Sequence, residues 1–590
     1  MALSQDGRMI TITTPLGKDV LIVEGFAGEE QVGRPFLYKI DLVSEDGEID
    51  PKKLLGQSIT LTVSCSDGRK RYVHGHVTSF QTHFETSFRF FRYELELRPW
   101  NWFLSKTTDC QIFQEMSVPD IIKDIFRQHG FSDFEDQLTE NYSEMVYCVQ
   151  YNETDLDFVQ RLMEQEGIYY FYTHTADKHS LVMCDSPNVH AETPGYEKIP
   201  YIPHDPTRSS YLESIGFWGV AHSITPSSVV LTDYNFETPK QDLLSPSGKQ
   251  TKSHAHDDYE QFAFPGVHGT PAEGERYAKI RLEEAQVEFE KFDARGNVAG
   301  ITPGAKFKLT DHPVAKNNKN YLLLGASLRL TNGGVIPGSG QDDQIDVGFI
   351  VIDATTPFRL PRSTPKPIVK GPQTAVVTGQ SGEEIHPDKY GRVKVKFFWD
   401  RYNPYNETSS CWIRVAHPIA GKRWGAHHLP RIGQEVIVEF LEGNPDRPII
   451  TGSVYNAETM PPYDLPGNKT RSGIKTNSSK GGQGYNEFRI EDKKGEEQIY
   501  MHAERQLDIR VKEDRLEFIA LNAVSWSSSC ARRRPRCRKA ARSDRRSRRS
   551  ACPTRRIPRD PSALRRAPDL RNIKTKPPYP VRTTLRQLSG

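Results

Sequence analysis

The chain has 590 residues, of which 36% are hydrophobic and 26% are charged, an ordinary balance for a globular protein. This length exceeds what one hydrophobic core supports, so we expect about three to five domains. The formal net charge of +2 hides an asymmetry, because residues 531–590 hold 21 Lys and Arg against 3 Asp and Glu while the remaining body is acidic. An acidic body argues against general binding of nucleic acid, which requires local positive potential.

The cysteines and the N-terminus narrow the class of protein further. The 8 cysteines are widely spaced and form no CxxC pair, which argues against a zinc ribbon or a redox motif. We expect reduced, mostly buried thiols in a chain that folds in the cytosol. Residues 1–14 lack the apolar core of a signal peptide, and no run of about 18 apolar residues predicts a membrane-spanning helix. We therefore expect any export to use a route other than a standard signal.

The first hundred residues have the pattern of strands. Phe36, Tyr38, Ile40 and Leu42 recur at the two-residue period of a sheet. The Gly and Pro content and the many aromatic and β-branched runs also favour a mainly β architecture. Further strands are predicted at 9–12, 20–26, 59–64, 71–80, 88–97, 168–172, 306–310 and 321–330.

Helices interrupt this β region. Ser117 is a favourable N-cap for a helix that ends near Gly130, and Thr154 is the N-cap of a second helix that ends at Gly167. Both segments carry apolar residues at helical spacing. A third helix is predicted over residues 273–292, where glutamates occupy the exposed positions.

The residue composition of the chain changes after residue 356. Five prolines within 357–372 predict an extended linker, which we place at 361–372. About five short alternating strands follow within 373–460, as expected for a small closed barrel of the OB type. Residues 461–520 then show short strands, among them one at 507–511, separated by charged turns. They hint at a short-period β-helical repeat.

Several long segments resemble a known family. They are CVQYNETDLDFVQRLMEQEGIYY at 148–170, YGRVKVKFFWDR at 390–401, SSCWIRVAHP at 409–418, WGAHHLPRIGQEVIVEFLEGNPDRPIITGSVYN at 424–456, RSGIKTNSSKGG at 471–482 and EFRIEDKKGEEQIYMHAE at 487–504. Over about residues 5–519 the chain resembles the VgrG spike proteins of type VI secretion. That family is in turn similar to the fused hub and spike of contractile phage tails.

The resemblance implies a fold and a division into domains. It implies a phage-hub-like region with two β-barrels at 1–360, the Pro-rich linker at 361–372 and an OB-fold spike base at 373–460. A linker and the start of a triple-stranded β-helical needle would occupy 461–520. The implied fold class is therefore mainly β with a few helices.

The resemblance also implies a structural function. The chain would be a homotrimeric tip protein that caps the Hcp tube ring, contacts baseplate proteins, a PAAR-type tip protein and effectors, and punctures the target membrane. It would assemble in the cytoplasm and then be secreted through the type VI apparatus. Such a protein is no enzyme, needs no cofactor and binds no specific nucleic acid.

Residues 521–590 depart from the family pattern. Fifteen Arg within 532–566, three further cysteines and few apolar residues cannot build a packed β-helix. Three interpretations remain open: out-of-frame translation, which we favour, a disordered basic arm for nucleic acid or anionic membrane, and a fused toxin domain. The shortage of apolar residues argues against the toxin domain.

We predict no catalytic, cofactor-binding or metal-binding residues. His74 and His76 would share one face of a strand but show no third ligand, and adjacent His427 and His428 would point to opposite faces. The acidic pairs are interpreted as solvated faces, caps and turns, the tryptophans as barrel core or trimer contacts, and Cys411 as a small buried residue. The residues concerned are Asp155, Asp157, Glu383, Glu384, Glu435, Glu439, Trp399, Trp412 and Trp424.

Two other functions are alternatives to this structural role. A spike fused to an effector hydrolase requires a folded domain beyond the needle. No HExxH, GxSxG or P-loop pattern occurs in a supporting context. An OB-type nucleic-acid binder that uses the basic tail requires a basic groove on the barrel as well.

Overall fold

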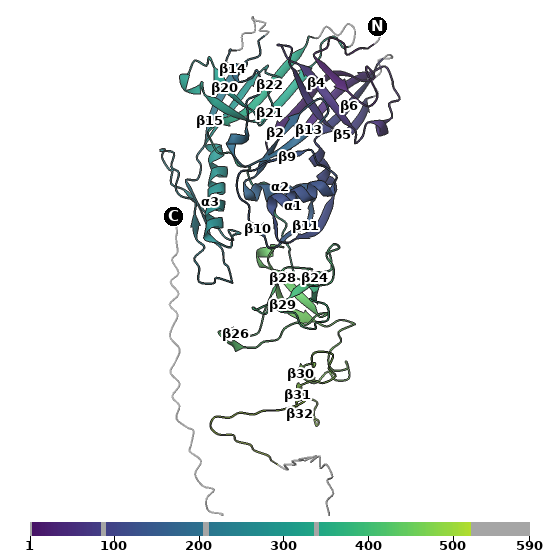
Figure 1. The fold of residues 1–590 in the computed structure, drawn as a ribbon, viewed down its shortest axis with the longest axis vertical. Coiled ribbons are helices and arrows are strands. Elements are labelled where there is room, and N and C mark those ends of the chain that lie inside the picture. Colours follow the sequence, from purple (N-terminus) through teal and green to yellow (C-terminus); the bar gives the residue numbers. More distant parts are fainter. Residues whose placement is uncertain (1–2, 84–89, 204–211, 336–341, 521–590) are drawn as a thin grey trace, which may run out of the picture. The chain divides into compact units, whose positions relative to one another are not determined.

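The computed structural model describes residues 3–83, 90–203, 212–335 and 342–520 (Figure 1). These residues are mainly β and include three α-helices, so the predicted fold class is confirmed. Among the described helices, none has the length and apolarity needed to cross a bilayer. The described residues up to 507 form one compact unit, and the described residues 508–520 lie outside it. The interpretations of residues 521–590 lie outside the described residues.

One twelve-stranded sheet dominates the first unit. β2 and β21 pair antiparallel from Gly25↔Thr331 to Gln31↔Gly325 and thereby join its N-terminal and C-terminal halves. The two expected barrels thus share one hydrogen-bonded sheet. In sheet order its strands are β1 (Ile10–Thr13), β4 (Ser58–Ser64), β5 (Lys70–His83), β6 (Phe91–Arg98), β3 (Arg34–Ser44), β2 (Ile22–Gln31), β21 (Asn320–Thr331), β22 (Gln344–Asp353), β19 (Glu290–Gly296) and β15 (Ile215–His222), with β20 (Lys306–Thr310) on β21 and β14 (Lys198–Pro200) on β20.

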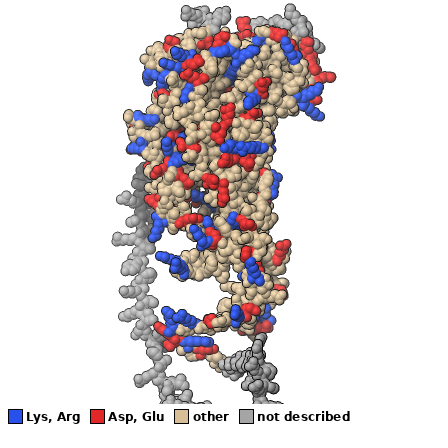
Figure 2. Space-filling model, viewed as in Figure 1, with Lys and Arg blue, Asp and Glu red and all other residues tan. Residues whose placement is uncertain are grey.

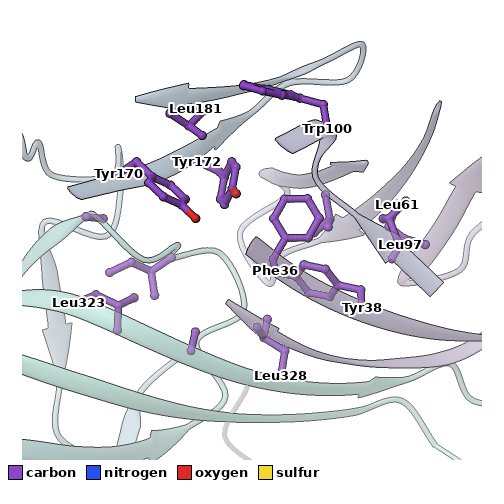
Figure 3. Packing of buried hydrophobic residues seen from close by; sticks show 14 of the residues in the cluster. Phe36, Tyr38, Leu61, Leu97, Trp100, Tyr170, Tyr172, Leu181, Leu323 and Leu328 are labelled. Atoms are coloured by element: carbon purple, nitrogen blue, oxygen red, sulfur yellow. The ribbon is translucent and has the colours of Figure 1, made fainter. Parts of the chain in front are cut away.

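Aromatic side chains fill the core beside this sheet (Figure 3). The ring of Phe36 packs edge-on against Tyr38 and Tyr172, with centroids 5.4 and 5.0 Å apart. The predicted alternation at 36–42 is confirmed, because Phe36, Tyr38, Ile40 and Leu42 are all fully buried. Smaller sheets pair β7 (Thr108–Phe113) with β11 (Cys148–Thr154), β8 (Met116–Ser117) with β10 (Glu144–Met145), β13 (His179–Cys184) with both β12 (Tyr169–His174) and β9 (Phe134–Gln137), and β16 (Ser228–Leu231) with β17 (Ser245–Pro246) and β18 (Glu260–Ala263).

The helix starts follow their capping residues. In α1 (Val118–Gln128) the Ser117 side chain accepts the backbone N–H of Asp120, and in α2 (Asp155–Glu166) Thr154 accepts that of Asp157. Thr270 forms a capping box with Glu273 at the start of α3 (Pro271–Gln286). The predicted end of this third helix at 292 is wrong, because the chain turns at 287–289 and enters β19, which pairs with both β15 and β22.

Residues 373–454 form the small barrel. Its five-stranded sheet has the order β24 (Lys394–Phe397), β23 (Gln373–Thr378), β28 (Glu435–Phe440), β29 (Pro448–Val454) and β25 (Arg414–Val415). Val395, Phe397, Val436 and Val438 are buried, as their alternation predicts. A separate hairpin, β26 (Ala420–Gly421) with β27 (Trp424–Gly425), projects from this module.

A three-stranded antiparallel sheet follows the barrel. It consists of β30 (Arg471–Lys475), β31 (Glu487–Glu491) and β32 (Gln498–His502). The strand predicted at 507–511 is absent from the described single chain, in which these residues adopt no regular secondary structure. An isolated strand leaves its backbone N–H and C=O groups without strand partners and is not stable alone.

Candidate functional site: a pinned joint and an exposed apolar face

The core of the small barrel continues into the large sheet domain. Ile112 on β7, Val149 on β11 and Tyr147 directly before β11 belong to the same buried cluster as the barrel residues. Water is excluded from this contact, so the barrel is packed against the preceding domain and is not tethered to it by a linker alone. The nine barrel residues of this cluster are Ala375, Val377, Val393, Val395, Phe397, Ile413, Val436, Val438 and Ile450.

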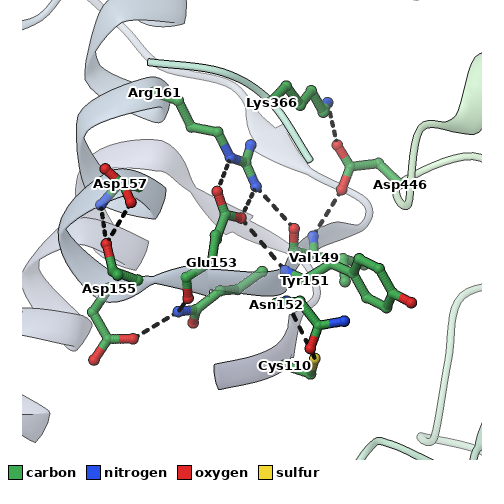
Figure 4. Close-up of polar contacts among 12 residues, drawn as sticks. Cys110, Val149, Tyr151, Asn152, Glu153, Asp155, Asp157, Arg161, Lys366 and Asp446 are labelled. Atoms are coloured by element: carbon green, nitrogen blue, oxygen red, sulfur yellow. Dashed lines mark hydrogen bonds and ion pairs between the residues drawn. The ribbon is translucent and has the colours of Figure 1, made fainter. Parts of the chain in front are cut away.

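One barrel carboxylate forms hydrogen bonds across this contact between the domains (Figure 4). We call the contact around it the pinned joint. Asp446, in the loop between β28 and β29, accepts the backbone N–H of Val149 at 2.8 Å and the Lys366 ammonium at 2.6 Å. Its side chain is 9% exposed. Charge-assisted hydrogen bonds in a partly dry site are stronger than exposed ones. Asp446 therefore ties together three segments that are far apart in sequence.

Behind this carboxylate, a buried ion pair supports β11. The Arg161 guanidinium donates to both Glu153 carboxylate oxygens at 2.8 and 2.6 Å and to the Val149 carbonyl at 3.0 Å. Burial raises the pKa of Glu153, although the hydrogen bonds from Arg161 oppose that shift. The fork of Arg161 thus fixes the backbone of Val149, whose N–H faces the barrel (Figure 4).

A second ion pair lies one residue further along the barrel loop. Arg447 contacts both carboxylate oxygens of Asp233 at 2.8 and 2.7 Å. Asp233 also accepts the backbone N–H groups of Tyr234 and Val267. Burial would raise the pKa of Asp233, but the hydrogen bonds from Arg447 and these amides outweigh it and hold the pKa below its usual value. Asp446 and Arg447, which are neighbours in the loop between β28 and β29, therefore bind two different parts of the larger domain.

The proline-rich segment is extended, and its contacts hold it along much of its length. Arg362 pairs with Glu284 through both its backbone N–H and its guanidinium, each at 3.0 Å. The backbone N–H and hydroxyl of Thr364 donate to Glu164 at 3.0 and 2.8 Å, and the N–H of Val369 donates to the Gly443 carbonyl at 2.8 Å. With Lys366 bound to Asp446, residues 361–369 act as a strap and not as a free spacer.

The sheet β30–β31–β32 has two chemically different faces. Register places Ile474, Phe488 and Met501 in one row and Ser472, Ile490 and Ile499 in the next, on the same face. In the single chain Phe488 is 43% exposed and Ile499 71% exposed. Water contact with such a face is unfavourable, so the face requires a partner.

The opposite face of this sheet is polar and internally paired. Glu491 contacts Arg471 at 2.8 Å, and Glu487 accepts from Tyr463 at 2.9 Å and lies 3.4 Å from Arg489. Both carboxylates are buried under these partners. The surface that still needs covering is therefore the apolar one.

The histidines identified in the sequence join a larger cluster. His74 is buried and His76 half-buried, and their rings lie on one side of β5 as predicted. Across the core, His179 Nδ1 lies 2.8 Å from His74 Nδ1, and His174 Nδ1 accepts the backbone N–H of His74. Burial lowers the pKa of His74 to about 4 and that of His179 to about 2. Within the described residues, no group of three or more His, Cys, Asp or Glu is arranged to hold a metal.

The other candidate residues take mostly structural positions. Glu383 pairs with Lys480, Glu384 accepts the N–H of Gly481, Glu435 binds Asn456 and Glu439 is exposed. Asp157 lies in the first turn of α2, where its carboxylate accepts the hydroxyl of the N-cap residue Thr154. The interpretation of Asp155 as a solvated residue is wrong, because it is buried between His129 and Gln150, each at 2.6 Å. Its carboxylate accepts from the Gln150 amide, five residues earlier, and contacts the ring of His129, which lies 26 residues earlier in the chain.

The tryptophans and Cys411 divide between core and surface. Trp399 packs against the barrel core and donates to Gln373, Trp412 lies beside His386, and Trp424 is exposed. Cys411 also packs against this core, and burial raises the pKa of its thiol to about 12. His427 and His428 line a groove together with His417.

Three protein families match successive parts of the chain. Residues 29–334 match the phage tail baseplate hub family, residues 373–455 the type VI secretion system/phage-baseplate injector OB domain, and residues 472–524 the bacteriophage T4 gp5 C-terminal trimerisation domain. The pinned joint lies between the first two matches, and the two-faced sheet lies within the third.

Curated relatives agree along most of the chain. It is 46% identical over 528 residues to the type VI secretion system spike protein VgrG1b of Pseudomonas aeruginosa, covering 88% of this chain and 70% of that one. It is 47% identical over 511 residues to VgrG1a of the same organism, covering 86% and 79%.

Two solved structures share the fold. The first is the E. coli c3393 protein, described as a type VI secretion component similar to T4 phage tail proteins gp27 and gp5, with 25% identity, a TM-score of 0.53 and coverage of 75% of this chain and 99% of that one. The second is VgrG in a Francisella complex with PdpA, with 11% identity, a TM-score of 0.55 and coverage of 84% and 88%; at that identity the likeness concerns the fold alone.

Proposed function

This chain belongs to the VgrG family of type VI secretion system spike proteins, and we propose that it works as a homotrimeric, non-enzymatic tip of that machine. Its role is mechanical: the larger domains form a collar, and the β30–β32 segments of three copies begin a shaft. In this role it caps a ring of the Hcp tube, docks on the baseplate and carries a PAAR-type tip protein and effectors. We propose that its three domains are residues 1–360, 373–460 and 461–520.

The exposed apolar face of β30–β31–β32 carries this proposal. Two rows of apolar side chains face water in the single chain while the reverse face is already paired. The same residues lie within the match to a trimerisation domain. Three such faces turned toward a common axis bury one another, which relieves the exposure without any further protein.

The pinned joint supports the mechanical role. A puncturing tip has to pass axial force from the collar to the shaft. Asp446, Arg447 and the strap at 361–369 supply several hydrogen bonds that load together, and the shared apolar core resists shear. Such a device needs no cofactor and no catalytic residue, because sheath contraction elsewhere supplies the energy.

No observation favours the two other functions that were weighed. On the face visible in Figure 2, acidic and basic side chains are interspersed. The interpretation that uses the basic tail for nucleic acid rests on residues outside the described ones. We propose assembly in the cytoplasm followed by secretion through the type VI apparatus, with the target membrane met only during puncture.

Sedimentation of the full chain tests the proposed trimer. We expect trimers for the native sequence, and loss of trimers for Phe488→Glu/Ile499→Glu, because charges on the apolar face would be buried without partners. Gln498→Glu, on the polar face of the same sheet, should leave the trimer intact. A native chain that sediments as a monomer over the micromolar range would contradict the proposal.

A further inference from the structure

A small hairpin on the barrel is exposed along its whole length. We call residues 419–425 the arm. It comprises β26, β27 and the turn between them, and every residue in it is exposed. Trp424 at its tip is 69% exposed and Ile419 is 53% exposed. The indole ring lies over Gly421, where a Cβ would approach it to 2.2 Å.

The arm is not expected to hold this shape alone. Only two residue pairs, Ala420↔Gly425 and Gly421↔Trp424, form its ladder. Its turn places Arg423 at φ 63°, in the left-handed region that non-glycine residues rarely adopt. A hairpin of this size is marginal in water. Tryptophan is among the residues that anchor interfaces most strongly, so the arm has the composition of a contact element.

A groove opens where the arm leaves the barrel. Its volume is about 1050 Å³, and Leu429 and Ile450 from the barrel and Ile474 from β30 are among its lining residues. Tyr455 and Met460 also line it and are 64% and 71% exposed. Ile474 belongs to the apolar face of β30–β31–β32, so the groove is continuous with the proposed trimer contact.

Acidic side chains lie on the chain segment that borders the groove, whereas the lining of the groove itself carries Arg431 and Lys475. The arm turn carries Lys422 and Arg423, both exposed. The segment that supplies Tyr455, Met460 and Pro462 to the groove also carries Glu458 and Asp464, which are exposed and whose side chains make no ion pair within the part of the chain that the structure describes. A basic turn directed toward this acidic segment, and away from Arg431 and Lys475, favours one orientation of docking.

We propose that the arm of one copy docks in the groove of the next copy, with Trp424 seated among Tyr455, Met460 and Ile474. The inference rests on the proposed trimer. Because the arm and the groove are different surfaces, the contact is heterologous, and a threefold rotation closes it into a ring without leaving either surface open. His417 and His427, which flank the arm on either side, line the groove of the same copy, whereas no residue of the arm does.

Photo-crosslinking of the full chain tests the docking. A photoreactive phenylalanine analogue in place of Trp424 should yield adducts between copies that map to Tyr455, Met460 or Ile474. The same analogue in place of Tyr405, an equally exposed aromatic residue of the barrel outside this groove, should give no adduct to those positions. Adducts confined to one copy, or none, from a sample that sediments as a trimer would overturn the inference but leave the trimer standing.

A charge exchange provides the second test. Lys422→Glu/Arg423→Glu and Glu458→Lys/Asp464→Lys should each lower the yield of adducts between copies about tenfold, and the four changes combined should restore it to within about threefold of the native charges. A merely structural role of these residues predicts no rescue. If the native sequence is monomeric, the proposed function fails as well, and sedimentation separates that result from failure of the arm alone.

Discussion

At the scale of single residues, the histidine cluster makes stability depend on pH. The His74 ring faces His179, His174 and His76 in the core, while the Asp133 and Asp177 charges favour its protonation only weakly, so burial dominates and its pKa falls to about 4. The unfolded chain takes up a proton near pH 6.5, but the folded chain does not. The free energy of unfolding should therefore be nearly constant above about pH 7 and fall by about 3 kcal/mol between pH 7 and pH 4 through this residue.

The variant His74→Gln isolates that contribution. It cannot be charged, so urea titrations at several pH values should show a shallower loss of stability between pH 6.5 and 4 than in the native chain. His256→Gln, at an exposed position, should keep the native slope. Equal slopes for His74→Gln and the native chain would contradict the assignment.

Residue-scale sequence patterns predicted only part of this cluster. The two-residue spacing of His74 and His76 correctly placed both on one side of a strand. His174 and His179 lie 100 and 105 residues further along, and packing of β12 and β13 against β5 brings them to His74. No local pattern encodes such a contact, and the same applies to buried Asp155 beside His129.

At the scale of helices and strands, the sequence predicts well those ends that are fixed by residues close in the chain. The starts of α1 and α2 were predicted because a capping side chain acts within three residues. The end of α3 was missed because the pairing of β19 with β15 and β22 overrides the helical pattern after Gln286. The strap was predicted as extended, but the acids that hold it, Glu164, Glu284 and Asp446, come from elements remote in sequence.

Removing one such acid should free the strap. Asp446→Ala leaves the Lys366 ammonium and the Val149 N–H without their acceptor, so the strap should detach locally while the domains stay folded. Limited trypsin digestion should then cut after Arg362 or Lys370 at least about ten times faster than in the native chain. Glu383→Ala, which removes an exposed acid of the same barrel, should not change the cleavage rate. Equal rates for Asp446→Ala and the native chain would show that Asp446 does not hold the strap.

At the scale of the whole described unit, the shared core makes the barrel and the large sheet domain depend on each other. Ile112, Tyr147 and Val149 complete a cluster whose other members all belong to the barrel. Domains joined by a flexible linker unfold independently, whereas domains that share a buried core unfold together. The native chain should therefore show one calorimetric transition for residues 3–460.

Truncating apolar side chains in the shared core should split the single calorimetric transition into two. Ile112→Ala/Val149→Ala removes apolar volume at the joint, at a cost of about 2–4 kcal/mol, and leaves the barrel with an incomplete core. The barrel should then unfold at a lower temperature than the sheet domain, giving two calorimetric peaks. Val229→Ala, which removes a buried residue beneath α3 and away from the joint, should lower stability without splitting the transition. If both variants keep a single peak, the apolar contact does not couple the domains, and force would have to pass through the Asp446 and Arg447 contacts alone.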